Sequence, residues 1–164
     1  MENKMVAAKT AISAFFTAAA ALLGWQGIMI VVWVAVMLID YLSGTFAAWK
    51  AGDWCSKTAR EGVWHKGGMI VVVAVSGIAD LIMHVICENL PVGIPWTSLI
   101  MPLVLAWYII TELGSILENA VKMGAKVPAW LVKLLRSSVK AIDTVGDGAA
   151  EEVQEALPEV SPEE

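Results

Sequence analysis

The stretch Trp107–Lys126, WYIITELGSILENAVKMGAK, joins an uncharged segment to an amphipathic one. From Asn89 to Thr111 the chain runs for 23 residues without a formal charge. A helix needs about 20 predominantly apolar residues to cross the hydrocarbon core of a bilayer. We therefore predict a membrane-spanning helix that ends near Thr111, and we interpret Glu112 as the point where the chain returns to water.

The composition supports a membrane protein with a solvated end. Hydrophobic residues make up 58% of the 164 residues and charged residues only 16%, whereas soluble domains average about 25% charged residues. Residues 1–142 contain all 11 lysines and arginines, and the last 22 residues contain eight acids and no base. The basic residues are spread over several segments, so no nucleic-acid-binding patch is predicted.

Similar apolar runs predict an all-α integral membrane protein with about four transmembrane helices, although three remain possible. The long run before Lys50 is interrupted by GWQG at Gly24–Gly27, and glycines of this kind punctuate helices. The predicted transmembrane bundle covers residues 1–112, with spans at about 6–23, 28–49, 67–87 and 92–111.

The loops predict the orientation of these spans. Basic residues concentrate in cytoplasmic loops of membrane proteins. Here they occur at the N-terminus, between residues 50 and 66, and after residue 121, but not in the connection between residues 88 and 96. Four spans with both termini in the cytoplasm place every basic segment inside.

Two acids, Asp40 and Asp80, fall inside the predicted spans. A charge near the bilayer centre costs at least about 2.5–3.5 kcal/mol, so such residues usually face a bundle interior or water. An interfacial position for Asp40 is equally open. His84 lies one helical turn after Asp80 and is a candidate partner for it. Asp40, Asp80 and His84 are therefore candidate polar residues for assembly within the membrane, and Gly44 offers a close helix contact for it.

After Glu112 the pattern becomes amphipathic. An apolar stripe repeats at helical spacing, with Glu118, Asn119 and Lys122 on the opposite face. We predict amphipathic cytoplasmic helices over residues 113–142 that lie on an anionic membrane surface or pack on a partner. Residues 143–164 form an acidic tail that is expected to be mostly disordered, with at most a frayed helix at 149–156.

No catalytic constellation is apparent in the sequence. It contains no GxSxG, HExxH or glycine-rich phosphate loop, and its two histidines fall on different sides of a predicted span. We therefore expect a protein that is not an enzyme and that has no cofactor and no metal site.

Four local patterns together resemble the toxin-secretion/phage-lysis holin family. DYLSG at Asp40–Gly44 resembles a D-x-x-[ST]-G signature, and a short basic loop, SKTAREGVWHKGG, follows it. An aspartate in the next span, Asp80, also fits. The most specific segment is ELGSILENAVKMGAKVPAWL, which is similar to the family's E-x-x-S-I-x-E-N pattern. Its matching positions are Glu112, Ser115, Ile116, Glu118 and Asn119.

The resemblance implies a phage or prophage protein that forms homo-oligomers in the lipid bilayer, with the bacterial cytoplasmic (inner) membrane as its expected location. Such proteins open lesions that release an endolysin, or a toxin, without necessarily contacting it directly. A small channel or transporter subunit, or a membrane scaffold that binds a cytoplasmic partner, is the alternative from another functional class.

Overall fold

The computed structural model describes residues 2–53, 55–89 and 96–156, and this part of the chain is helical apart from its connections. The four helices are α1 (Glu2–Ala51), α2 (Ser56–Asn89), α3 (Ile100–Lys122) and α4 (Ala129–Ala156). Within the described ranges there is no strand, as the predicted all-α class requires.

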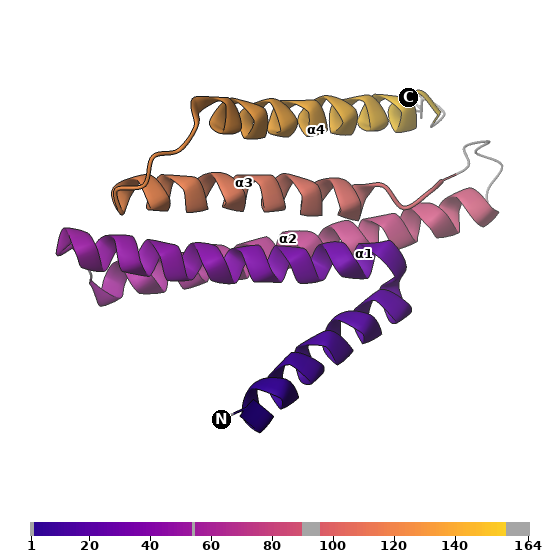
Figure 1. Ribbon diagram of the computed structural model, residues 1–164. Helices are drawn as coiled ribbons and strands as arrows, with labels where there is room; N and C mark the ends of the chain where they lie inside the picture. The colour runs from indigo at the N-terminus through magenta and orange to yellow at the C-terminus, as the bar shows by residue number, and fades with distance from the viewer. Residues whose placement is uncertain (1, 54, 90–95, 157–164) are drawn as a thin grey trace.

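Helix α3 is the central element of the structure. It packs against α1, α2 and α4, with α4 along one side of it and α1 and α2 along the other (Figure 1). The N-terminal part of α1 turns away from this assembly. The turn occurs at Gly24, whose φ of 60° interrupts the helix, and glycine adopts this conformation without a Cβ penalty. The predicted break at GWQG is therefore confirmed.

Three helical segments are long and apolar enough to cross a membrane, namely Gly24–Ala51, Gly62–Asn89 and Ile100–Lys122. The first two agree with the predicted spans at 28–49 and 67–87. The backbone of the predicted span at 6–23 is helical, but most of its side chains lie outside the described residues. The question of three or four spans thus concerns this segment alone.

The predicted span at 92–111 is displaced along the chain. Residues 96–99 are not helical, residues 92–95 lie outside the described part, and α3 continues past Thr111 to Lys122. Gly124, just after the helix, has a left-handed φ of 98°. Its amide bonds to the Val121 carbonyl, and the amide of Ala125 bonds to the Ala120 carbonyl. This paired pattern is a Schellman cap, so the helix ends here rather than at Glu112.

The outward faces of the spans are apolar. On helix α2, for example, a series of large aliphatic side chains is exposed: Ile70, Val71, Val75, Ile78, Leu81, Ile82 and Val85. Exposed apolar surface of this extent marks contact with a membrane or another protein. In a membrane-spanning chain these side chains meet lipid or a neighbouring copy.

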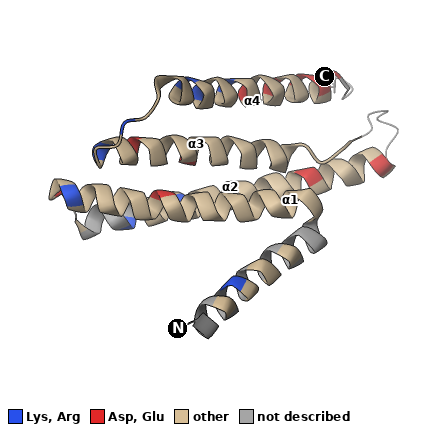
Figure 2. Ribbon diagram, in the orientation of Figure 1, with Lys and Arg blue, Asp and Glu red and all other residues tan. Residues whose placement is uncertain are grey.

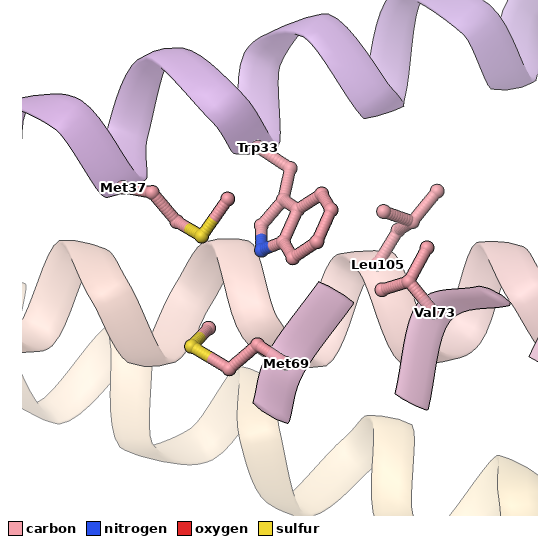
Figure 3. Close-up of a cluster of buried hydrophobic side chains, with 5 residues drawn as sticks. All are labelled: Trp33, Met37, Met69, Val73 and Leu105. Atoms are coloured by element: carbon pink, nitrogen blue, oxygen red, sulfur yellow. The ribbon is translucent and has the colours of Figure 1, made fainter. Parts of the chain in front are cut away.

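A small apolar core joins the three spans. Trp33 and Met37 of α1 point toward Met69 and Val73 of α2 and Leu105 of α3 (Figure 3). Leu105 is fully buried. The Trp33 ring also stacks on Tyr108 of α3, with 6.2 Å between the ring centroids.

Helix α4 runs from Ala129 to Ala156 as one continuous element. The prediction of a disordered tail is wrong for residues 143–148, which are helical, whereas the helix allowed at 149–156 is present as the end of α4. Residues 157–164 lie outside the described part. Apolar positions continue at helical spacing beyond Ile142, and this side of the helix packs toward α3. The predicted amphipathic region 113–142 is divided between the end of α3 and the beginning of α4.

Candidate functional site: a polar network between three helices

One lysine and two carboxylates meet where α1, α2 and α3 come together. The Lys66 Nζ atom of α2 lies 2.9 Å from Oδ2 of Asp40 and 2.5 Å from Oε2 of Glu112. Glu112 is buried, and the side chains of Lys66 and Asp40 are 17% and 18% exposed. We call this cluster, together with Asn119 and Ser43, the three-helix network.

Asn119 extends the three-helix network along α3. Its Nδ2 atom donates to Oδ1 of Asp40 and to Oγ of Ser43, each at 3.1 Å. Gly44 of α1 lies beside this amide, and a Cβ there would lie 3.4 Å from Nδ2 of Asn119, an ordinary van der Waals distance. Gly44 thus lies against Asn119 within one chain, and its role in assembly stays a prediction.

Lysines and arginines gather at the end of the structure where α1 is followed by α2 and α3 is followed by α4 (Figure 2). Lys50 at the end of α1 donates to the carbonyl of Met123, which follows α3, so the two helices end side by side. Glu112 precedes Lys122 by ten residues, which corresponds to about 15 Å of helix. The charges of the three-helix network therefore reach well inside the spanning segments.

The electrostatic balance explains why these charges are tolerated. Moving an ion out of water costs several kcal/mol, and only a well-placed partner with further hydrogen bonds offsets this cost. Lys66 contacts both carboxylates, and Asp40 also accepts from Asn119. With both acids ionised the cluster has one negative charge in excess. Both carboxylates share Lys66 as their cation, so the loss of Lys66 would leave both without an ion-pair partner.

Two sequence-based interpretations of this region were wrong. Glu112 does not mark a return to water, because it is buried and ion-paired within a helix that continues for ten more residues. Asn119 does not face away from the bundle, because its amide lies between α1 and α3. The error arose from treating residues after Glu112 as a separate solvated helix.

Asp80 serves a different purpose, at the other end of α3. Its Oδ1 accepts from the amides of Leu99 and Ile100, each at 3.0 Å, and its Oδ2 accepts from that of Met101 at 2.7 Å. The next residue, Pro102, has no amide hydrogen, and the amide of Leu103 bonds within the helix. Asp80 of α2 therefore caps every free donor in the first turn of α3.

The cap replaces one that α3 cannot supply itself. Leu99 occupies the N-cap position and has no side-chain hydrogen bond, whereas this position usually carries Ser, Thr, Asp or Asn. The indole of Trp96 also donates to Asp80, at 3.3 Å. The pairing of Asp80 with His84 was predicted wrongly, because exposed His84 instead lies 3.3 Å from Glu88.

The remaining motif positions lie on other sides of α3. Ser115 and Glu118 line a groove between α3 and α4, and Glu118 is exposed while Ile116 is half-buried. The E-x-x-S-I-x-E-N segment therefore contributes Glu112 and Asn119 to the three-helix network. Their spacing of seven residues, two helical turns, places both on the side of α3 that meets α1 and α2.

Lys66 and Ser43 were missed as members of this cluster. Lys66 was assigned to the basic loop before the second strongly apolar span, because the uncharged run begins at Gly67. The sequence did contain a sign of this pairing, since Asp40 needed a basic partner and Lys66 immediately precedes the next apolar run. Ser43 follows Asp40 by three residues on the same helical face, within the DYLSG pattern.

Comparison with known proteins identifies the family of the chain. Residues 17–138 match the bacteriophage holin family, which includes the three candidate spans and all members of the three-helix network. An uncharacterised protein of Halalkalibacterium halodurans is 34% identical over 110 residues, covering 67% of this chain and 77% of the relative. A Listeria monocytogenes protein is 33% identical over 114 residues, covering 70% and 74%.

A third relative, from Clostridium perfringens, is 27% identical over 136 residues, which covers 83% of this chain and 96% of its own length. No solved structure matches the chain. The family match covers well over half of the residues and contains both the D-x-x-S-G and the E-x-x-S-I-x-E-N patterns. The chain belongs to the bacteriophage holin family.

Proposed function

We propose that this protein is a holin that oligomerises in the bacterial cytoplasmic membrane and opens lesions for an endolysin or a toxin. Family membership and three apolar helices support a multi-pass membrane protein. The observation that carries the proposal is the three-helix network, in which Lys66 forms ion pairs with both Asp40 and Glu112 between three spans. Such a cluster holds the spans of one chain together while their outer faces remain apolar.

The proposed opening is a rearrangement of these spans within an oligomer. When copies accumulate, helix contacts between chains replace those within a chain, and the charged side chains of the network then face water in the lesion. Gly67 and Gly68 on α2 have open space around them, which permits close approach of a neighbouring helix. The endolysin or toxin passes through the lesion and need not bind the protein.

The proposed orientation places the basic end of the bundle in the cytoplasm. The end where α1 meets α2 and where α3 meets α4 carries Lys50, Arg60, Lys122 and Lys126, whereas no base occurs between residues 67 and 121. The positive-inside rule favours this orientation. Lys4 and Lys9 favour a cytoplasmic N-terminus as well, with residues 6–23 returning across the membrane as a fourth span.

Cysteine labelling in intact cells tests this topology. With Cys55 and Cys87 replaced by serine, a cysteine at Thr97 is expected to react with an impermeant maleimide, whereas one at Asp53 should react only after the cells are opened. A cysteine at Lys4 should behave like the one at Asp53 if residues 6–23 cross the membrane. Labelling of the Asp53 position in intact cells would reverse the proposed orientation.

Inducible expression tests the lytic function. We expect membrane potential to collapse abruptly after a delay, with simultaneous release of a folded cytoplasmic reporter enzyme. The variant Asp40→Asn, which alters the three-helix network, should shift the time of collapse, whereas the exposed-site control Glu155→Gln should retain the original timing. Both variants must reach the same level in the membrane.

The same experiment separates the alternative functions. A selective channel or transporter subunit would dissipate an ion gradient but retain the reporter enzyme inside the cell. A membrane scaffold would change neither the potential nor the retention of the enzyme. Either outcome would reject the lytic proposal, provided that the amount of the protein in the membrane matches that of other overexpressed proteins of similar size.

A further inference from the structure

Helix α4 has two faces of opposite character. Its apolar face contacts α3 through half-buried Val132, Leu135, Val139 and Ile142. Every charged side chain of the helix is exposed, with three bases in its first half and five acids in its second: Lys133, Arg136, Lys140, Asp143, Asp147, Glu151, Glu152 and Glu155. The helix is thus strongly amphipathic and changes charge sign at about Ile142.

The position of α4 in the structure conflicts with α3 as a membrane span. The first half of α4 lines a groove with residues 110–122 of α3. Farther along, Asp143 and Asp147 line a second cavity with Leu103 and Trp107. Trp107 precedes Lys122 by 15 residues, or about 22 Å of helix, so these acids lie deep within the bilayer thickness of about 30 Å.

The contact between α3 and α4 has little to offset this cost. Among the described residues, no hydrogen bond or ion pair joins the two helices, and the groove between them has a volume of about 570 Å³. In water, the contact is favoured because it covers apolar surface on both helices. In a bilayer that driving force disappears, because lipid tails are as apolar as leucine, while each acid held at the depth of the hydrocarbon core is strongly disfavoured.

Charge identifies the surface to which α4 moves. Between residues 113 and 142 there are five bases and one acid, Glu118. Each base near an anionic leaflet contributes attraction, and an amphipathic basic helix buries its apolar face at the headgroup level. The connection from Met123 to Pro128 contains Gly124 in a left-handed conformation, which allows the chain to turn sharply where α3 leaves the bilayer.

We propose that in the inserted protein α4 separates from α3 and binds the anionic cytoplasmic leaflet through residues 129–142. The apolar face that packs on α3 in this structure then contacts lipid, and Lys133, Arg136 and Lys140 meet phosphate headgroups. The acidic half, from Asp143 onward, extends into water because the same surface repels it. The proposal depends on the proposed membrane insertion and orientation and is independent of lesion formation.

Spin labels in proteoliposomes test the position of α4. With Cys55 and Cys87 replaced by serine, a label at Val139 is expected at headgroup depth in vesicles that contain phosphatidylglycerol, and a label at Glu151 in water. Labels placed together at Thr111 and Val139, which line one groove in the structure, should be far apart. A short distance between them in these vesicles would overturn the proposal.

Matched charge variants test the role of the bases. Replacing Lys133, Arg136 and Lys140 with glutamine should reduce the ratio of surface-bound to released α4 by about a hundredfold, since each base contributes about a fivefold attraction. Replacing Glu151, Glu152 and Glu155 with glutamine removes the same number of charges and should not weaken surface binding. Equal effects of the two triple variants would contradict a specific role for the basic half.

Insertion is measured separately, by protease protection of the segment between α2 and α3. A protein that inserts and shows surface-bound α4, but releases no reporter enzyme in cells, would reject the lytic proposal alone. A protein that inserts with α4 still beside α3 would reject the present proposal alone.

Discussion

Replacing Lys66 with methionine is expected to lower the free energy of unfolding by about 3–5 kcal/mol, the usual cost of removing one partner of a buried ion pair. The change leaves Asp40 and Glu112 next to each other without a cation, and Glu112 is buried. The methionine side chain fills nearly the same volume, so the effect reports the lost charge. Unfolding of the purified protein in mixed micelles measures it.

Two further variants separate charge from packing. Combining Lys66→Met with Asp40→Asn and Glu112→Gln removes all three charges at similar volume and should recover most of the lost stability, because no ion then remains unpaired. Arg60→Met is the matched control, since Arg60 is an exposed base on the same helix. If Lys66→Met unfolds at the same denaturant concentration as Arg60→Met, the three-helix network does not stabilise the fold.

The result has a functional counterpart. If the three-helix network holds the spans in the arrangement that precedes opening, Lys66→Met should kill cells earlier than the unmodified protein at equal membrane levels. The neutral triple variant should return toward the original timing. Membrane potential after induction gives both values, and a Lys66→Met protein that inserts but never depolarises the membrane would instead place Lys66 in the open state.

The spans could be predicted from hydropathy because each apolar run has the length that a bilayer requires. Two of the three described spans agree closely with those predictions. The C-terminal boundary of α3 could not be located in this way, because a charge was assumed to end a span. Glu112 remains inside because Lys66, 46 residues earlier, neutralises it, and a single sequence gives no direct sign of that contact.

In the candidate site, too, part of the arrangement could be predicted from sequence and part could not. Asp40 and Asp80 could be singled out from sequence because isolated acids in apolar runs need partners. Their partners could not be identified correctly: His84, one turn away on the same helix, was the candidate for Asp80, and no partner was named for Asp40. The actual partners come from other helices: Lys66 for Asp40, and the first turn of α3 for Asp80.

Asp80→Ala is the second change with a large expected effect. It removes the acceptor for three backbone amides of α3 and for the Trp96 indole. A hydrogen bond to a charged group contributes about 1.5–3 kcal/mol, and a buried donor that loses its acceptor keeps the cost of its desolvation; Asp80 is buried. We expect the stability to fall by about 4 kcal/mol or more, the equivalent of two such bonds.

The isosteric variant Asp80→Asn is expected to have an intermediate stability, for a geometric reason. Its carbonyl oxygen can still accept from Leu99 and Ile100, whereas its amide nitrogen cannot accept from Met101, which now bonds to Oδ2. His84→Ala is the matched control, because exposed His84 lies one turn from Asp80 and contacts Glu88 instead. The expected order of stability is unmodified protein and His84→Ala, then Asp80→Asn, then Asp80→Ala.

Hydrogen exchange distinguishes this cap from a contact between copies of the chain. The amides of Ile100 and Met101 should lose protection in Asp80→Ala, while those near Lys122 at the other end of α3 should change much less. Because Asp80 is satisfied within one chain, crosslinked oligomers should form in normal proportion from whatever protein remains folded. Loss of oligomers with full protection at Ile100 and Met101 would show that Asp80 acts between chains, and that α3 has another cap.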